Sequence, residues 1–356
     1  MARTRAAVAT RHTARSARAL SVGVPYRIAN LVCLYEGGSA RTQGDGAGRS
    51  AQRACERSSD WPRGAEPPDP ERAIIRRSIV HHMAVGPGVT QVRPGDVAFA
   101  AEPHAEAMVV DARKVVPLPP DVDYEAAAFT YLPTLGLHAL RSAAYTPGEN
   151  VLVIGQGIVG VLAAQVARLV GARVVAFEPD ATRRLVAQRA GVERILDPRA
   201  DESNVQVEAF FGEPGPDVII ETSQSWSGLA DAIRVAHAGT RIAVVGIYRA
   251  DPAPDTAAAL LRASFMDRDH FHNQHVRFIG CSNDPAEDYP PDAVRWTIKR
   301  NMQYVAEHII AGTLAPARAI THRFCWNDLE QVYDRLASGD RSMVGITLDW
   351  DSPDIA

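Results

Sequence analysis

A six-residue stretch near the middle of the chain has the composition and spacing of a phosphate-binding turn. It lies between two apolar segments, residues 151–154 and 161–170, which predict a strand and a helix. Glycine at the first position permits a tight turn, glycine at the third lets a pyrophosphate approach the backbone, and glycine at the sixth lets the helix pack close to the strand. We therefore predict a dinucleotide-binding β-α-β unit with these cofactor-binding residues: Gly155, Gln156, Gly157, Ile158, Val159 and Gly160.

An acidic residue follows the next predicted strand, residues 173–177. This residue, Glu178, lies near the roughly 20-residue offset at which a dinucleotide fold places an acid for the adenosine ribose. Its carboxylate would accept the ribose hydroxyls and repel a 2′-phosphate, which favours NAD. Arg183 and Arg184 keep NADP open, since they either form a solvated helix face or reach a phosphate. The predicted cofactor is NAD, with NADP as the alternative.

The remaining pattern of this region predicts a Rossmann fold, a doubly wound parallel sheet. Further strands are expected at residues 194–196, 217–221, 241–246 and 276–280, with helices at 181–190 and 228–236. Gly246 and Ile247 end one of these strands at the carboxyl edge, where we predict contact with the nicotinamide side of the cofactor. Residues 221–223 end the neighbouring strand and either line the same crevice or only cap the strand.

Bulk composition limits the class of protein. The chain has 356 residues, 46% of them hydrophobic, which predicts two globular domains with ordinary cores. A net charge of −4 gives no basic field for nucleic acid, and no apolar run reaches the length of a membrane span. The four cysteines are far apart and lack CxxC spacing. We expect a cytoplasmic protein with reduced thiols, a small-molecule partner, and no nucleic-acid or membrane contact.

The first 72 residues differ from the rest of the chain. They contain no acid before Glu36, several arginines among small residues, and a Gly-, Ser-, Arg- and Pro-rich stretch at residues 36–70. This composition predicts a low-complexity, poorly ordered or atypical segment. An organelle transit peptide, a short buried stretch at residues 20–34 and a start that does not descend from a functional protein remain alternatives.

Several segments beyond residue 80 resemble medium-chain dehydrogenases/reductases, closest to the polyol and threonine dehydrogenase branch. They are VGPGVTQVRPGDV at residues 85–97, AEAMVV at 105–110, LGLHAL at 135–140, PGENVLVIG at 147–155 and the closing residues 343–350. The resemblance implies a β-rich GroES-like catalytic domain, incomplete at its N-terminal side, joined to the Rossmann domain. The expected bounds are 73–146 with 299–356 for the first and 147–298 for the second. It also implies a homodimer or homotetramer and hydride transfer between a nicotinamide and an alcohol or carbonyl.

The zinc ligands of the family do not match. Members with catalytic zinc carry an early Cys, a Gly-His-Glu motif, and a Cys or Glu about five residues before the glycine matching Gly136, where this chain has Tyr131. His81 and His82 lie too close to the VGPGV turn, so no metal site is predicted. Tyr131 either donates a hydrogen bond to the substrate oxygen or fills the emptied zinc position, and His138 either relays a proton or packs. These two are the candidate catalytic residues.

Two other histidine positions have weaker interpretations. His104 is expected to be structural or to contact substrate, and residues 267–275 form an Asp- and His-rich cluster that either binds a metal or forms a loop. For the whole chain, the first hypothesis is a zinc-independent NAD(P)-dependent alcohol or polyol-type dehydrogenase or reductase. The alternatives are a non-catalytic dinucleotide-binding relic or regulator of the same fold, and a structural or scaffold protein.

Overall fold

The computed structural model describes residues 26–31, 78–82, 89–101, 110, 114–248, 255, 272–281 and 295–349. By its internal contacts the chain divides into two compact units. The first contains Met1–Ala29 and Leu34–Val122, and the second contains Asn30–Cys33 and Asp123–Ala356. In the part of the chain that is described, no helix is long and apolar enough to cross a membrane.

The second unit contains a six-stranded parallel sheet in the order β10-β9-β8-β5-β6-β7. The chain moves outward from β5 to β7 and then returns to the other side of β5 at β8. The strand order therefore reverses between β5 and β8, the place where doubly wound sheets bind ligands. The predicted Rossmann sheet is confirmed, with these strands: β5 (Asn150–Ile154), β6 (Arg173–Phe177), β7 (Ile195–Leu196), β8 (Val218–Glu221), β9 (Arg241–Val244) and β10 (Arg277–Gly280).

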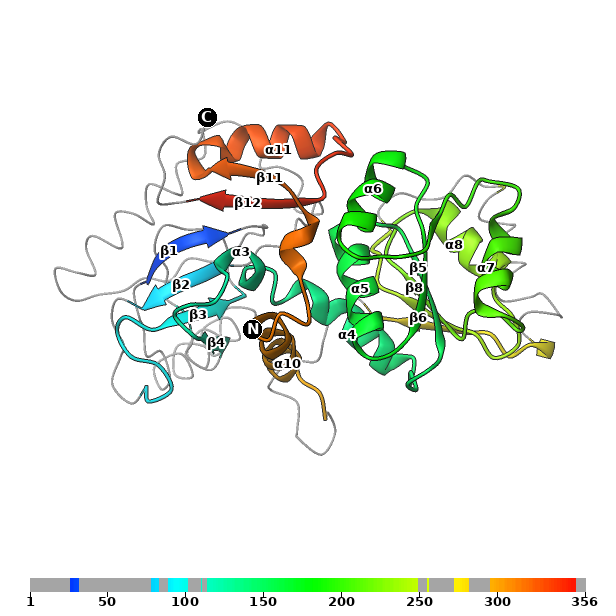
Figure 1. Ribbon diagram of the computed structural model, residues 1–356, viewed down its shortest axis with the longest axis horizontal. Helices are drawn as coiled ribbons and strands as arrows, with labels where there is room; N and C mark the ends of the chain where they lie inside the picture. The colour runs from blue at the N-terminus through cyan, green and yellow to red at the C-terminus, as the bar shows by residue number, and fades with distance from the viewer. Residues whose placement is uncertain are drawn as a thin grey trace, which may run out of the picture. The chain divides into compact units, whose positions relative to one another are not determined.

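Helices cover both faces of this sheet (Figure 1). On one face lie α4 (Leu132–Ser142), α5 (Ile158–Leu169) and α6 (Ala181–Arg189), and on the other α7 (Ser203–Phe211) and α8 (Trp226–Arg234). The sequence analysis did not predict α7. Val205 and Val207 alternate with polar residues at a period of two, which is typical of a strand. The buried positions Ser203, Val207 and Phe211 instead follow the helical spacing of four residues.

The core of the sheet is built by strands that are apolar on both faces. The described residues of β8 are all buried, as are the last four of β5. Such continuous apolar strands are typical of parallel sheets covered by helices on both sides. One buried cluster lies between the sheet and the helices α7 and α8, and it includes Leu152, Ile154, Val175, Phe177, Ile219, Ile233 and Ile242. This core fixes the carboxyl ends of β5, β6 and β8 relative to one another.

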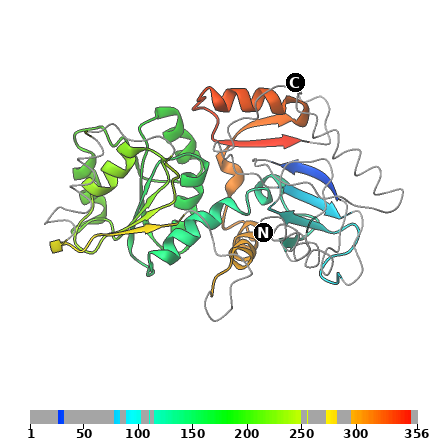
Figure 2. The same ribbon diagram turned by 180° about the vertical axis from the view of Figure 1, so that it is seen from behind.

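The remaining elements of the second unit come from both sides of the Rossmann sequence. They are α3 (Tyr124–Ala127), α10 (Ile298–Ile310), η4 (Pro316–Ala319), β11 (Ile320–Cys325), η5 (Trp326–Asp328), α11 (Leu329–Ala337) and β12 (Gly345–Asp349). β11 and β12 pair in parallel, and α11 lies over them (Figure 2). Arg323 of β11 donates two hydrogen bonds to Glu125 of α3, at 2.5 and 2.8 Å. This bidentate pair connects segments nearly 200 positions apart in the chain.

Further strands lie outside the Rossmann sheet. In the first unit, β2 (Ser78–His82), β3 (Val97–Ala100) and β4 (Val115–Leu118) pair antiparallel, which agrees with the predicted β-rich domain. The strand β1 (Tyr26–Leu31) belongs to the segment expected to be atypical, and its Leu31 pairs with Leu348 of β12. The other residues of that segment lie outside the described ones. The domain bounds near residues 72, 146 and 298 stay a prediction.

Candidate functional site

The six-residue glycine turn connects β5 to α5 at the carboxyl edge of the sheet. Gly155 has a φ of +85°, a conformation that a side chain would strain, and its N–H donates to the Phe177 carbonyl at 2.8 Å. Gly157 caps the start of α5. A Cβ added at Gly157 would meet no atom closer than the Arg183 Nη1 at 3.9 Å. The backbone at Gly157 is therefore open to an approaching group.

The third glycine sets how closely α5 packs against the turn. A Cβ at Gly160 would lie 1.8 Å from the Gly155 carbonyl oxygen and 2.8 Å from the Thr222 hydroxyl. That hydroxyl lies 2.9 and 3.0 Å from the carbonyl oxygens of Ile154 and Gly155 and donates to them. The turn, the start of α5 and the segment after β8 thus form one close-packed unit. Ile158 and Val159 are half-buried in the first turn of α5.

The structure places Glu178 directly beside this turn. Its side chain is buried, and its two carboxylate oxygens accept the backbone N–H of Gln156 at 2.7 Å and of Asp180 at 2.9 Å. An ionised carboxylate has about four acceptor positions, so two amides leave capacity for ribose hydroxyls. Gln156 is also buried, and its side-chain amide donates to the Gly155 carbonyl at 2.9 Å. Gln156 therefore braces the turn with its side chain and holds Glu178 with its backbone.

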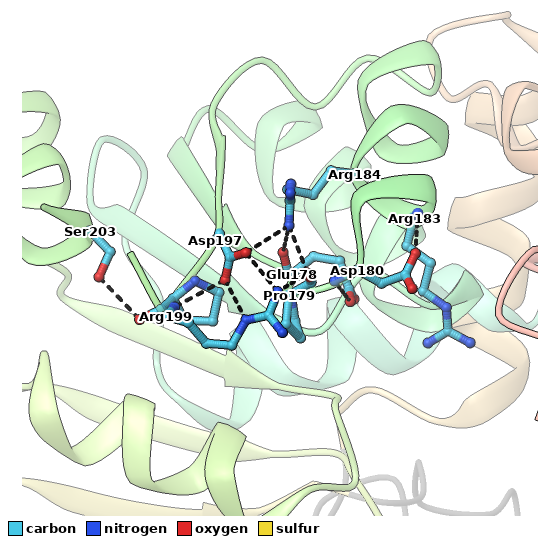
Figure 3. A network of polar contacts seen from close by, with 9 residues as sticks. Glu178, Pro179, Asp180, Arg183, Arg184, Asp197, Arg199 and Ser203 are labelled. Carbon is cyan, nitrogen blue, oxygen red and sulfur yellow. Dashed lines mark hydrogen bonds and ion pairs between the residues drawn. The ribbon is translucent and has the colours of Figure 1, made fainter. Parts of the chain in front are cut away.

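Three guanidinium groups surround Glu178, and they behave differently (Figure 3). Arg184 and Arg199 both contact Asp197, the residue after β7, whereas Arg183 extends away from this group. Arg184 also donates to the carbonyl oxygens of Glu178 and Pro179, each at 2.8 Å. The side chain of Arg199 holds the pKa of Asp197 down at about 2 through its hydrogen bonds. Of the two arginines predicted to be candidates for a phosphate, only Arg183 points toward the glycine turn.

A second acidic residue lies on the other side of the strand reversal. Glu221, the last residue of β8, is fully buried and accepts the Ser223 N–H at 2.7 Å and the Tyr248 hydroxyl at 2.5 Å. Burial raises the pKa of Glu221, and it also raises the pKa of Tyr248 above its ordinary value. The Tyr248 ring packs against Trp226 with centroids 4.6 Å apart. The segment after β9 is thereby fastened to the end of β8.

The two predicted nicotinamide-side residues lie in that fastened segment. The N–H of Gly246 donates to the Glu221 carbonyl at 3.0 Å, and a Cβ at Gly246 would lie 2.8 Å from the Glu221 carboxylate. Ile247 is half exposed. The glycine turn, Glu178 and Gly246 are therefore brought to the same carboxyl edge of one sheet. This agrees with the arrangement that the sequence spacing predicted.

The comparisons with known proteins agree with this geometry. The family model for zinc-binding dehydrogenases matches residues 159–298. L-galactonate-5-dehydrogenase of Escherichia coli K12 is 27% identical over 229 residues, which cover 64% of this chain and 60% of that protein. D-guloside 3-dehydrogenase of Shigella flexneri is 29% identical over 233 residues, covering 64% of this chain and 63% of that protein.

These matches make the chain similar to medium-chain dehydrogenases/reductases, chiefly over its Rossmann half. It matches less than two thirds of the length of these two relatives. Its fold is also similar to the crystal structure of a short chain alcohol dehydrogenase of E. coli CFT073 complexed with NADH. The TM-score is 0.65 and the sequence identity 16%, over 93% of each chain. The resemblance stated from the sequence is therefore confirmed.

Both candidate catalytic residues belong to α4, Tyr131 as its N-cap and His138 within it. Tyr131 is buried at the N-cap position, and its carbonyl accepts the Thr134 N–H at 2.9 Å. His138 is half-buried in the middle of the helix, with its Nε2 3.5 Å from the Ser142 hydroxyl. Seven helical residues span about 10 Å, so the helix places the two on one side but two turns apart. Their catalytic roles stay predictions.

A catalytic zinc would need three well-placed donors. Among the described residues, no three His, Cys, Asp or Glu side chains lie close enough together to hold a metal ion. Tyr131 presents a phenol at the position where zinc-using members present Cys or Glu. His104 and residues 267–271 of the Asp- and His-rich cluster lie outside the described residues.

Sequence reasoning missed two features of the site. Asp197 and Arg199 follow β7 with no recognisable motif, and only the pairing of β7 with β6 shows that they adjoin Glu178. The contact between Glu221 and Tyr248 was also missed, although both strand ends were noted. An acid at a strand end and a tyrosine two residues after a strand-ending glycine were the available signals.

Proposed function

We propose that this protein is a nicotinamide-dependent oxidoreductase that transfers a hydride between the cofactor and an alcohol or carbonyl substrate. The observation that carries the proposal is the glycine turn, in which Gly157 leaves the backbone open while Gly160 packs α5 onto the turn. This combination aims the N-terminal N–H groups of α5 at an anion beside Gly157. The names of the two similar dehydrogenases support a polyhydroxylated alcohol as the substrate class.

For the cofactor we propose NAD in preference to NADP. Glu178 is buried beside the turn with acceptor positions left for the ribose hydroxyls, and a 2′-phosphate would meet its negative charge. Arg183 lies beside Gly157, where its guanidinium is suited to the pyrophosphate. Gly246 and Ile247 border the nicotinamide end. The similar structure that contains NADH supports the same cofactor class.

For the chemistry we propose a mechanism without zinc. The cofactor, when bound, supplies or accepts the hydride. The phenol of Tyr131 would donate a hydrogen bond to the substrate oxygen and stabilise negative charge that develops there. In carbonyl reduction, the substrate oxygen would take the phenol proton of Tyr131 as the hydride adds to the carbonyl carbon, and His138 would return a proton from solvent to the phenolate; alcohol oxidation would reverse these transfers. The proposal rests on Tyr131 at the position of a family zinc ligand, and it includes a homodimer or homotetramer as the working assembly.

The test is a titration of the purified full-length chain with NADH and NADPH, followed by turnover assays with a panel of polyols and sugar acids. We expect NADH binding tighter than NADPH binding and NAD-dependent oxidation of at least one secondary alcohol. Binding without turnover on any substrate would favour the non-catalytic alternative. Absence of dinucleotide binding would refute the proposal. Light scattering of the same sample gives the oligomeric state.

A further inference from the structure

Two arginines next to the ribose acid are engaged by a single carboxylate. Asp197 accepts both Nε and Nη2 of Arg199, at 2.9 and 2.8 Å, in a bidentate pair. Its Oδ2 also lies 3.2 Å from Arg184 Nη1. The backbone N–H of Arg199 donates to Oδ1 at 3.0 Å. Both oxygens of Asp197 are therefore occupied by arginine donors.

The register of the sheet places this group against Glu178. Phe177 pairs with Leu196, and the Glu178 N–H donates to the Leu196 carbonyl at 3.0 Å. Asp197 is the next residue after Leu196, so it lies beside Glu178 on the neighbouring strand. Figure 3 shows Arg184 and Arg199 converging on Asp197 and on the backbone of the ribose acid. Both guanidiniums therefore lie against the backbone of Glu178 and Pro179, next to the residue whose carboxylate is proposed to bind the ribose.

The two arginines direct their donors away from that position. Arg184 Nη1 is shared among Asp197 and the carbonyl oxygens of Glu178 and Pro179. Arg199 Nη2 donates to Asp197 and, at 2.5 Å, to the Pro179 carbonyl. Without Asp197, the two guanidiniums would keep the carbonyls of Glu178 and Pro179 as acceptors but would lose the negative charge that they share. Planar guanidinium groups are the preferred protein ligands of phosphate, so their placement decides whether a 2′-phosphate is accepted.

We propose that Asp197 is a specificity-determining residue that keeps Arg184 and Arg199 from binding a 2′-phosphate, and that it acts together with Glu178. This inference rests on the proposed dinucleotide site. Glu178 discriminates by repulsion at the ribose, and Asp197 discriminates by withholding the cations that would compensate the phosphate. The two contributions are separable, because Glu178 has its own backbone donors in Gln156 and Asp180.

The test is a double-mutant cycle with Glu178→Ser, Asp197→Asn and the combination of both. Kd is measured for NADH, NADPH, 5′-ADP and 2′,5′-ADP, so the readout does not depend on activity. We expect Glu178→Ser alone to reduce modestly the ratio between the Kd values for NADPH and NADH. Adding Asp197→Asn should tighten NADPH binding by a further tenfold or about that, the size expected for a charged hydrogen bond. This second substitution should leave the affinity for 5′-ADP nearly constant, because 5′-ADP has no 2′-phosphate.

A matched control comes from a similar ion pair elsewhere. Asp231 pairs with Arg234 on α8, and its side chain is 22% exposed, close to the 24% of Asp197. Asp231→Asn should leave all four affinities unchanged. If Asp197→Asn does not fold, Arg184→Met and Arg199→Met are made with Asp197 intact. If Asp197 keeps these arginines away from the 2′-phosphate, removing either one should not change binding, so both variants should bind 2′,5′-ADP as the wild type does.

Three results would overturn the inference. Wild-type preference for NADPH, or weaker 2′,5′-ADP binding in Asp197→Asn, would show that Asp197 organises the arginines as a phosphate clamp. An unchanged NADPH affinity in the folded double variant would show that the arginines do not reach the phosphate. A wild-type protein that binds neither dinucleotide refutes the proposed function and, with it, this inference. The second result leaves the proposed function intact, which separates the two failures.

Discussion

Adding one methyl group at two glycines of the same turn should have opposite consequences. In Gly157→Ala the new carbon would lie in open space, with its nearest neighbour 3.9 Å away at the flexible end of Arg183. The residue is in extended backbone that alanine adopts readily, with φ −70° and ψ −179°. Fold stability should therefore change little, because restriction of the unfolded chain by alanine, about 0.4–1 kcal/mol, is offset by the poorer N-cap that alanine provides. The methyl would, however, occupy the backbone surface that the pyrophosphate needs.

In Gly160→Ala the methyl would lie 1.8 Å from the Gly155 carbonyl oxygen, where side-chain carbons are essentially never found closer than 3.0 Å. Either the turn or α5 must move by about 1 Å. The turn is held by the Gly155 hydrogen bond to Phe177, and α5 is held by the buried residues Val161 and Leu162. Overpacking typically costs about 1–3 kcal/mol, and rigid backbone on both sides places this variant near 3 kcal/mol or above.

The assay combines urea unfolding followed by circular dichroism with NADH titration of the folded protein. For Gly157→Ala we expect wild-type stability and NADH binding at least about tenfold weaker, which is 1.4 kcal/mol. For Gly160→Ala we expect a large loss of unfolding free energy. Unchanged NADH affinity in Gly157→Ala would refute the placement of the pyrophosphate over this residue. A stable Gly160→Ala would refute the close packing of α5.

Three other outcomes are expected. Arg241→Met should lower the unfolding free energy by about 3–5 kcal/mol, because it leaves Glu149 and the Ala143 carbonyl without their buried cation; Glu149→Gln should cost less, and urea unfolding measures both. Elemental analysis should find far less than one zinc per chain, and a chelator should leave any turnover intact; stoichiometric zinc would contradict the role given to Tyr131. The folded-state pKa of Asp197 is lowered from 3.8 to about 2 by Arg199, so the stability it contributes is present above pH 3.8 and lost as pH falls toward 2. The unfolding free energies of the wild type and of Asp197→Asn, measured with urea across this pH range, should converge at the acid end. A difference that stays constant with pH would contradict the role of the Asp197–Arg199 pair.

The Rossmann half could be predicted from sequence because its signals are local. The central strands β5, β6 and β8 each contain an apolar run, and the glycines of the turn report steric needs that the structure shows directly at Gly155 and Gly160. The helix α7 was the exception, since its alternating valines imitate a strand. A local pattern predicts the secondary structure of such a segment only when one periodicity dominates. Here the segment is a helix because its buried residues, spaced by four, pack against the sheet.

The other half could not be predicted to the same depth, because its contacts are far apart in the chain. β1 lies within the first 72 residues, which were predicted to be low-complexity with a short buried stretch at residues 20–34 as an alternative, and its Leu31 pairs with Leu348 of β12. Its partner β12 is more than 300 positions away. Likewise Glu125 is bound by Arg323, and neither residue belongs to a motif. Composition describes only what a segment can bury by itself. A strand also gains stability from the strand with which it pairs, and that contribution cannot be read from its own residues.

The same limit applies to the cofactor preference. Glu178 follows from an offset along the chain, because the strand, turn and helix that separate it from the glycines have standard lengths. Asp197 follows from no offset. It reaches the ribose acid only because Phe177 pairs with Leu196, and a shift of that register by one residue would move Asp197 off Glu178 and release Arg184. The position of Glu178, which would repel a 2′-phosphate, is thus set within one β-α-β unit. The position of Asp197, which binds the two arginines that could attract a 2′-phosphate, is set by the pairing of strands in the assembled sheet. The sequence of α6 alone gives Arg183 and Arg184 the same role as possible phosphate ligands. The structure gives them different contacts, because Arg183 binds the Arg341 carbonyl whereas Arg184 binds the Glu178 carbonyl. The role of such arginines can therefore be assigned only when the strand that pairs with β6 is known.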